Sequence, residues 1–290
     1  MAKHFLNIPI VYKFGTRWIG YIPTYLSYAI FHAIADISHV FYRSAVKSVE
    51  ANLRLVYPNA SKEEISAKSK KLFRNYAESL IDYGRFTNLD KSTLLTKITR
   101  FDGKENLDDA LKMGKGVILL TAHLGNWELG GIFFGAYGLK TNVVTLPDED
   151  PKIDASRRWY RMGYGVKTIT LGDSPLATIE LVKALNNKEV IAMLIDRYNS
   201  NQDNIEVEFF NKPTLFPRGP FVLSRITGAP IIVSFVVKEK SGYRGIVEKP
   251  LTVKAKNDES ELLKKVVKIF ERYIVKYADQ WYDFRLRIRR

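Results

Sequence analysis

The chain has 290 residues, of which 46% are hydrophobic and 26% are charged, a composition that suits a folded protein and excludes wholesale disorder. It has no cysteine, which excludes disulfides, thiolate-bound metals and a cysteine nucleophile and is consistent with a reducing compartment. The formal net charge of +14 favours an anionic partner, which on charge alone is nucleic acid, an anionic membrane surface, or an acidic protein or substrate.

The first predicted element is an apolar and aromatic stretch at residues 18–42, which Pro23, His32, Asp36 and His39 interrupt. A helix that crosses a bilayer needs about 20 mostly apolar residues and tolerates ionisable side chains poorly. Asp36 therefore favours a helix that lies on or dips into the membrane interface. An ordinary buried helix at the edge of a domain is the alternative. No cleavable signal peptide is expected.

Residues 44–98 are expected to be helical. Ser61 followed by Glu64 forms the capping-box pattern that starts a helix. After this pattern, apolar side chains recur at spacings of three to four residues, which predicts a buried stripe made of Leu72, Tyr76, Leu80 and Tyr83.

From about residue 103 onward, short apolar runs alternate with helical segments. The expected strands are 117–121, 142–146, 167–170, 190–195 and 231–237, and the expected helices are 107–113, 175–186 and 258–277. The strand runs are continuously apolar, which is typical of a sheet that is covered on both faces. The sequence therefore predicts an α/β fold with a mixed, largely parallel central sheet flanked by helices.

The most informative segment runs from Thr121 to Gly131 and contains the sequence HLGNWE. His123 comes at the end of a predicted strand, where open α/β sheets place their ligands. Gly125 permits a tight turn, and a helix that starts after it leaves backbone N–H groups aimed outward. Glu128 follows about one helical turn later, where a carboxylate can hold an imidazole in one tautomer and stabilise its protonated form. His123 and Glu128 are therefore a candidate general base and its partner.

Other kinds of site are disfavoured by the motifs that the sequence lacks. The chain has four histidines, no cysteine and no HExxH motif, so no metal site is predicted. The nucleophile elbow of serine hydrolases, the P-loop and the dinucleotide-binding glycine motif do not occur in the sequence. A single histidine is more often structural than catalytic, so the residues alone leave both interpretations open.

The segment from His123 to Glu128 resembles the H-x4-D/E motif of the glycerolipid acyltransferase superfamily. Its HxGNWE form, with flanking glycines, resembles the late lipid A biosynthesis acyltransferase branch, whose relatives acylate phosphatidylinositol mannosides. Further segments are similar to blocks of the same branch: 52–58, 73–76, 192–197, 207–210, 219–230 and 280–282. The resemblance therefore covers about residues 15–285, close to the full length.

The resemblance implies an acyl transfer reaction. His123 would take a proton from an acceptor hydroxyl while Glu128 orients its ring, and the hydroxyl would attack a thioester directly, without an acyl-enzyme or a cofactor. The expected substrate-binding residues are Asn126, Arg158, Arg161, Asp196 and Arg197. Asp196 is expected to shape the acceptor pocket, whereas Arg158 and Arg161 fit either a phosphate site or a solvated helix face.

The implied domain organisation is a membrane-associating segment at residues 1–42 followed by an acyltransferase domain at 43–290. Within this domain we expect a helical part at 44–98, an α/β core at 103–250, and a C-terminal helix with a basic tail at 258–290.

The implied partners are acyl carrier protein or coenzyme A as the thioester donor, and a membrane glycolipid, first of all a lipid A precursor, as the acceptor. The basic chain would then act on the anionic cytoplasmic face of an inner membrane, bound peripherally or by an N-terminal anchor. Two alternatives are a lysophospholipid, glycerol-phosphate or phosphatidylinositol-mannoside acyltransferase and, from another class, a non-catalytic polybasic membrane-binding protein. Nucleic acid is not expected, because the sequence has no nucleic-acid-binding signature.

Overall fold

The computed structural model describes residues 19–147, 150–172, 175–198 and 203–285, which fall into two compact units. The helical unit contains the described residues up to Asp90 and those from Ile274 onward, and the α/β unit contains the described part of Lys91–Tyr273. Residues 1–18 of the predicted membrane segment and residues 286–290 of the basic tail lie outside the described residues.

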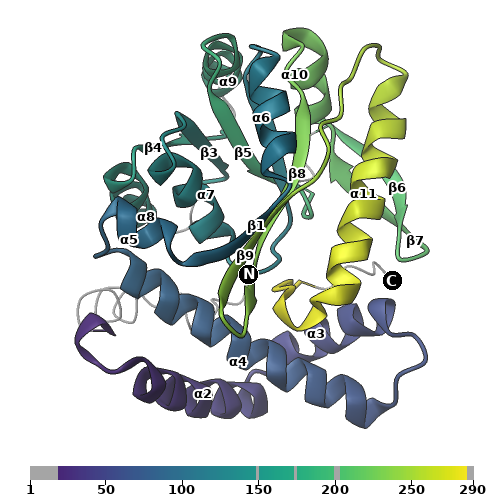
Figure 1. Ribbon diagram of the computed structural model, residues 1–290. Helices are drawn as coiled ribbons and strands as arrows, with labels where there is room; N and C mark the ends of the chain where they lie inside the picture. Colours follow the sequence, from purple (N-terminus) through teal and green to yellow (C-terminus); the bar gives the residue numbers. More distant parts are fainter. Residues whose placement is uncertain (1–18, 148–149, 173–174, 199–202, 286–290) are drawn as a thin grey trace. The chain divides into compact units, whose positions relative to one another are not determined.

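The helices of the helical unit are η2 (Ile19–Tyr21), α2 (Thr24–Phe41), α3 (Arg43–Val56), α4 (Lys62–Phe86) and η3 (Ala278–Gln280) (Figure 1). The predicted capping box starts α4: the Ser61 hydroxyl accepts from the Glu64 N–H at 3.1 Å, and the Glu64 carboxylate accepts from the Ser61 N–H at 2.7 Å. In the predicted stripe, Leu72 and Tyr83 are buried and the two residues between them are half-buried.

Side-chain amides tie the last described residues to the helices of this unit. Asn52 of α3 is buried and donates from Nδ2 to the carbonyl oxygens of Asp283 at 3.0 Å and Arg285 at 2.8 Å. Asn75 of α4 donates to the Asp279 carbonyl oxygen at 2.9 Å. Asn52, which lies in one of the segments that carry the resemblance, therefore has a structural role.

Among the described residues of the α/β unit, seven strands form one sheet in the order β1-β9-β8-β2-β5-β3-β4, and β6 and β7 form a separate hairpin. The strands are β1 (Ile98–Asp102), β2 (Val117–Thr121), β3 (Thr141–Thr145), β4 (Val166–Thr170), β5 (Val190–Leu194), β6 (Asn204–Phe209), β7 (Lys212–Pro217), β8 (Ile231–Glu239) and β9 (Gly242–Val247). Neighbours in the large sheet are parallel, except that β8 and β9 are antiparallel. The predicted mixed, largely parallel sheet is confirmed.

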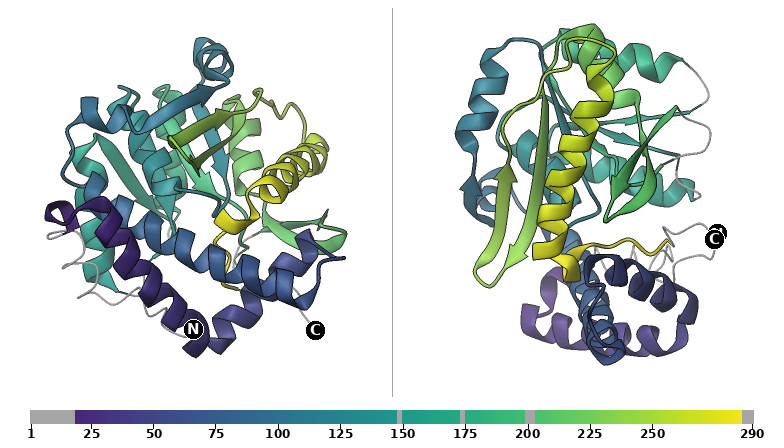
Figure 2. Two further views of the ribbon diagram at one scale, coloured as in Figure 1. Left: turned by 60° about the horizontal axis from the view of Figure 1, so that its bottom comes forward. Right: turned by 90° about the vertical axis from the view of Figure 1, so that its right-hand side faces the viewer.

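The helices of this unit are α5 (Lys91–Leu95), α6 (Lys104–Lys112), α7 (Trp127–Ala136), α8 (Pro151–Gly163), α9 (Leu176–Asn186), α10 (Gly219–Thr227) and α11 (Asp258–Lys276), the last of which ends in the helical unit. α6 and α7 lie on one face of the sheet, and α9 and α10 lie on the other (Figures 1 and 2). The strands and helices expected after residue 103 agree with the structure to within about three residues at each end. The sequence did not predict β1, β6, β7, β9, α8 or α10, because these strands mix polar with apolar residues, α8 is mostly polar, and α10 is short.

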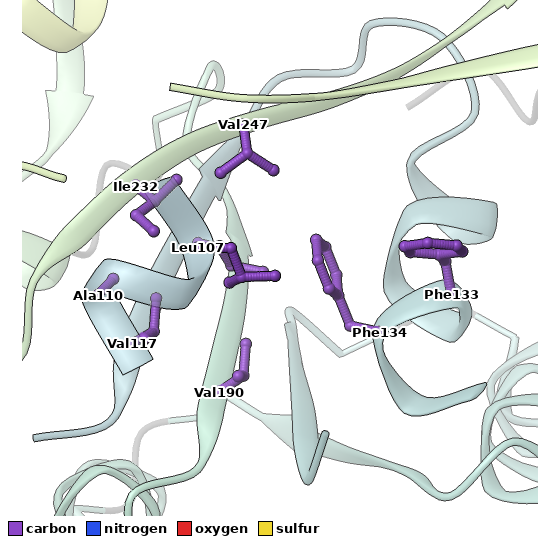
Figure 3. Close-up of a cluster of buried hydrophobic side chains, with 9 residues drawn as sticks. Leu107, Ala110, Val117, Phe133, Phe134, Val190, Ile232 and Val247 are labelled. Atoms are coloured by element: carbon purple, nitrogen blue, oxygen red, sulfur yellow. The ribbon is translucent and has the colours of Figure 1, made fainter. Parts of the chain in front are cut away.

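A hydrophobic cluster holds the central strands in place. The first four residues of β2 are buried. The cluster combines side chains from α6, β2, α7, β5, β8 and β9 (Figure 3): Leu107, Ala110, Val117, Leu119, Phe133, Phe134, Val190, Ile232 and Val247. Full burial of one large apolar side chain contributes about 1.5–3 kcal/mol, so the cluster fixes β2 and β5 firmly.

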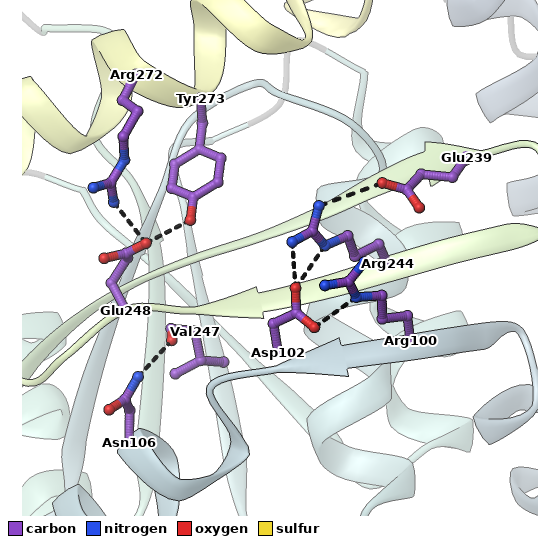
Figure 4. Close-up of polar contacts among 9 residues, drawn as sticks. All are labelled: Arg100, Asp102, Asn106, Glu239, Arg244, Val247, Glu248, Arg272 and Tyr273. Atoms are coloured by element: carbon purple, nitrogen blue, oxygen red, sulfur yellow. Dashed lines mark hydrogen bonds and ion pairs between the residues drawn. The ribbon is translucent and has the colours of Figure 1, made fainter.

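Polar contacts fix the edge of the sheet at β1 (Figure 4). Asp102 accepts hydrogen bonds from Arg244 Nε of β9 and from Arg100 Nε, each at 2.8 Å. Asn106 of α6 donates to the Val247 carbonyl oxygen of β9 at 2.9 Å. These contacts attach β1 and α6 to β9.

Candidate active site

The pairing of β2 with β5 brings His123 next to Asp196. In the register of these parallel strands, Thr121 lies opposite Leu194. Each of the two site residues lies two positions beyond these strand ends, and the Ile195 N–H continues the pairing by donating to the Thr121 carbonyl oxygen at 3.1 Å. Because the carboxyl ends of parallel strands meet at one edge of the sheet, two residues 73 positions apart come together there.

Asp196 binds His123 through both carboxylate oxygens. Oδ1 lies 2.7 Å from the imidazole Nδ1, and Oδ2 accepts a hydrogen bond from the His123 backbone N–H at 3.0 Å. The side chain of Asp196 is 0% exposed and that of His123 is 16% exposed. A carboxylate that accepts from Nδ1–H leaves the lone pair on Nε2, which is the arrangement of a general base. Asp196, which the sequence assigned to the acceptor pocket, thus directly contacts the candidate base.

Glu128, the expected partner of His123, forms an ion pair with Arg161. Glu128 lies in the first turn of α7, and Arg161 of α8 donates to it from Nη2 at 2.7 Å and from Nε at 3.1 Å. Arg161 is 3% exposed, and its Nη1 also donates to the Thr168 hydroxyl at 3.2 Å. The contact to the imidazole nitrogen that the structure describes comes from Asp196, and an orienting role for Glu128 stays a prediction.

The pKa of the Glu128 carboxyl lies below its ordinary value. Burial acts to raise this pKa, but the charge and hydrogen bonds of Arg161 outweigh burial, and Arg157 and His123 contribute in the same direction. Glu128 is therefore ionised at neutral pH, and its negative charge acts on the imidazole in addition to that of Asp196.

The turn between His123 and α7 depends on Gly125 and Asn126. Gly125 has a φ of +68°, and a Cβ at this position would collide with the carbonyl oxygen of Val236, so the turn requires glycine. The Asn126 N–H donates to the same carbonyl oxygen at 2.7 Å, and its Oδ1 caps α7 by accepting from the Leu129 N–H at 2.9 Å. These contacts give Asn126 a structural role, and the substrate contact expected from the sequence stays a prediction.

The remaining expected residues are two arginines. Arg158 of α8 donates from Nε to Asp154 at 2.7 Å, and its side chain is 41% exposed. Arg197 directly follows Asp196 and is half-buried. Within the described parts of the chain, no group of three or more His, Asp or Glu side chains is placed to hold a metal ion.

Arg157 is a charged residue near the site that the sequence did not single out. It lies four residues before Arg161 and therefore on the same face of α8, and its charge helps to lower the pKa of Glu128. The signal in the sequence is this spacing of four, which has meaning only once the segment is known to be a helix.

Comparisons with known proteins place this geometry in context. Residues 4–290 match a family model described as bacterial lipid A biosynthesis acyltransferase. The chain is similar to a phosphatidylinositol mannoside acyltransferase of Mycobacterium tuberculosis (strain CDC 1551 / Oshkosh), with 27% identity over 57% of this chain and 55% of that protein. It is also similar to the lipid A biosynthesis lauroyltransferase of Escherichia coli (strain K12), with 23% identity over 92% of this chain and 87% of that protein. The lipid A biosynthesis palmitoleoyltransferase of the same organism is 24% identical over 86% of this chain and 80% of its own length. The chain thus spans little more than half the length of the mycobacterial relative.

Proposed function

Because the chain belongs to the bacterial lipid A biosynthesis acyltransferase family, we propose that it transfers a fatty acyl group from a thioester to a hydroxyl of a membrane glycolipid. The observation that carries this proposal is the contact between His123 and Asp196, an arrangement that suits a general base at the carboxyl ends of two buried strands. A sequence without cysteine is in keeping with direct attack on the thioester by the acceptor.

In the proposed reaction, His123 Nε2 accepts the proton of the acceptor hydroxyl while the hydroxyl oxygen attacks the thioester carbonyl carbon. The C–S bond then breaks, the acyl group stays on the acceptor oxygen, and the imidazolium gives its proton to the leaving thiolate. Asp196 holds the ring and stabilises the imidazolium, and ionised Glu128 adds a second negative charge. Backbone N–H groups in the first turn of α7 can donate to the oxyanion that develops on the carbonyl oxygen.

The proposed acceptor is a lipid A precursor, and a phosphatidylinositol mannoside is the second candidate. The first is favoured by the family model and by two Escherichia coli relatives that align with most of this chain. The second is favoured by the higher identity of the Mycobacterium tuberculosis relative, over a shorter region. The proposed donor is an acyl carrier protein or coenzyme A thioester, and the net charge of +14 suits either, since both carriers are anionic.

The proposed place of action is the anionic cytoplasmic surface of an inner membrane. The distribution of side chains on α2 supports it, because polar side chains face α4 and large apolar ones are exposed. The side of α2 that faces α4 carries polar side chains, such as Tyr28, which contacts Asp82 at 2.6 Å, and His32, which contacts Glu78 at 2.7 Å. The exposed side of α2 carries large apolar side chains: Tyr25, Leu26, Ile30, Ile37, Val40 and Phe41. An exposed apolar face on a helix is typical of a helix that lies in a membrane interface. In the part of the chain that the structure describes, no helix is both long enough and apolar enough to cross a bilayer.

The membrane role of α2 can be tested with the double variant Ile37→Ser, Phe41→Ser. These side chains are 58% and 75% exposed, so their loss should weaken binding to anionic phospholipid vesicles by about tenfold or more with little loss of stability. Sedimentation with vesicles measures the bound fraction, and Val275→Ser, which changes a 48% exposed side chain of α11, is the control. Unchanged binding of the double variant would exclude this face of α2 as the membrane contact.

The acyl transfer itself is tested by a screen of acceptors with purified protein and two labelled donors, an acyl carrier protein thioester and a coenzyme A thioester. Lipid A precursors, phosphatidylinositol mannosides and lysophospholipids are compared side by side, with His123→Ala as the control. Label that moves to a glycolipid only when His123 is present supports the proposal and identifies the acceptor class. If folded wild-type protein moves label to none of these acceptors from either thioester donor, the proposed reaction is wrong.

A further inference from the structure

We propose that Trp127 is a positioning residue for the base: its indole ring packs on the His123 imidazole and stabilises the imidazole in its protonated form. The inference rests on the proposed role of His123 in proton transfer. It adds an aromatic group to the two carboxylates already described, and it assigns a role to a residue of the HLGNWE segment that the mechanism has not yet used.

The geometry places the two rings in direct contact. Trp127 is the first residue of α7 and follows His123 by four positions. The ring centroids are 5.0 Å apart, and the ring planes meet at 65°, an edge-to-face arrangement. Both side chains are partly buried. The tight turn at Gly125, anchored by the bridge to Val236, sets the distance between the strand end and the helix start.

The chemistry of this contact changes when the base takes up a proton. An imidazole becomes a cation at that moment, and a cation over the face of an aromatic ring, within about 6 Å, is attracted by about 0.5–2 kcal/mol, depending on how far the pair is desolvated. The 65° angle between the ring planes fits an imidazole that points an edge at the indole face, which is the attractive orientation. An aromatic ring carries no net charge, so it needs no counterion, and its partial burial beside the imidazole costs little solvation free energy.

The charged groups around the imidazole make such an additional attraction relevant. Asp196, at the end of β5, and Glu128, in the first turn of α7, both favour the imidazolium. Arg161 and Arg157 of α8 act on Glu128 with the opposite charge. Because the arginines compensate much of the Glu128 charge, we infer that Asp196 and the indole ring together carry most of the stabilisation.

The test is a titration of the His123 imidazole by NMR in the full chain. The chain has four histidines, and the signal that disappears in His123→Gln identifies the residue. In Trp127→Leu the pKa of His123 should be lower than in the wild type, and in Trp127→Phe it should return most of the way. Trp159→Leu is the matched control, because Trp159 of α8 is 66% exposed and belongs to the same unit.

Kinetics give a second readout. We expect kcat of Trp127→Leu to fall by about 2- to 30-fold with KM changed by less than about twofold, and the acid limb of the pH profile to move in the same direction as the imidazole pKa. If Trp127→Leu does not fold, Trp127→Met, which fills more of the same space, replaces it.

An unchanged or raised pKa in the folded non-aromatic variant would overturn the inference, and so would an equal effect of Trp159→Leu. A chain that transfers no acyl group but shows the lowered pKa would contradict the proposed function while supporting the contribution of Trp127. The NMR titration therefore separates the two failures.

Discussion

Two regions of the α/β unit each place a carboxylate near the candidate base, and the two carboxylates have different partners. At the end of β5, Asp196 binds the imidazole Nδ1 and the backbone N–H of His123. In the first turn of α7, Glu128 is held by Arg161, a buried cation. The acidic residue that is nearer to His123 in the sequence is therefore not the one that contacts its imidazole. The carboxylate five positions away pairs with an arginine, and the carboxylate 73 positions away contacts the base.

Substitutions of Asp196 and Glu128 should therefore have different effects. The side chain of Asp196 is fully buried and contacts His123 through both carboxylate oxygens, so a change there should act on the proton transfer. Glu128 compensates a buried guanidinium that also binds Thr168, so a change there should weaken the ion pair that links α7 to α8 and lower stability.

The largest effect on activity is expected from the removal of the His123 imidazole. His123→Ala takes away the proposed base, and we expect kcat for acyl transfer to fall by about 1,000- to 10,000-fold. Circular dichroism should still show a folded chain, and the melting temperature should fall by a few degrees, because the buried Asp196 carboxylate keeps the His123 backbone N–H but loses the imidazole. A folded variant that keeps full activity would remove His123 from the reaction.

A substitution of Asp196, at the end of β5, should have the next largest effect on activity. In Asp196→Asn the carboxylate charge is lost and the amide can hold the imidazole in the other tautomer. We expect kcat to fall by about 100- to 1,000-fold with little change of KM. Asp154→Asn, which alters a carboxylate of α8 paired with Arg158, is the control and should stay close to wild type.

A substitution of Glu128, in the first turn of α7, should lower the stability of the folded protein more than its rate of acyl transfer. In Glu128→Gln the buried Arg161 loses its counter-charge, and we expect the free energy of unfolding to fall by about 3–5 kcal/mol in urea titrations. We expect kcat of the folded variant to fall by only about tenfold. The double variant Glu128→Leu, Arg161→Met should recover much of the stability, because no unpaired charge is left.

The smallest expected effect is the pH dependence of the stability that the Glu128–Arg161 ion pair contributes. The pKa of Glu128 is lowered in the folded chain, so its contribution to stability is fully present above the unfolded pKa of about 4.3 and is lost as the pH falls through the folded value. The difference in unfolding free energy between wild type and Glu128→Gln should therefore be largest near pH 7 and shrink below about pH 4. A difference that grows on acidification would contradict the ion pair.

Much of the α/β unit could be predicted from the sequence because its strands are continuous apolar runs. β2 has the predicted bounds, and β3, β4 and β5 differ from theirs by about one residue. The edge strand β1 and the hairpin β6–β7 were not predicted, since β1 has only exposed and half-buried positions and the hairpin mixes exposed, half-buried and buried ones.

The candidate site was only partly predictable for a related reason. The motif locates His123 and Glu128, but the contact of His123 with Asp196 depends on which strands are neighbours, and sequence periodicity does not give strand order. The partner of Glu128 depends on α8, a helix with no long apolar run that was not recognised. For α2 the sequence shows an apolar and aromatic stretch, but only the contacts with α4 and the exposed fractions show which side of the helix points outward.

The most direct test of the central claim is a cycle of transfer rates for the wild type, His123→Ala, Asp196→Asn and the double variant, with both substrates saturating. If Asp196 acts through His123, the double variant transfers the acyl group no more slowly than His123→Ala alone. If the two losses multiply instead, Asp196 acts independently of the histidine, and the assignment of His123 and Asp196 as one catalytic pair is wrong.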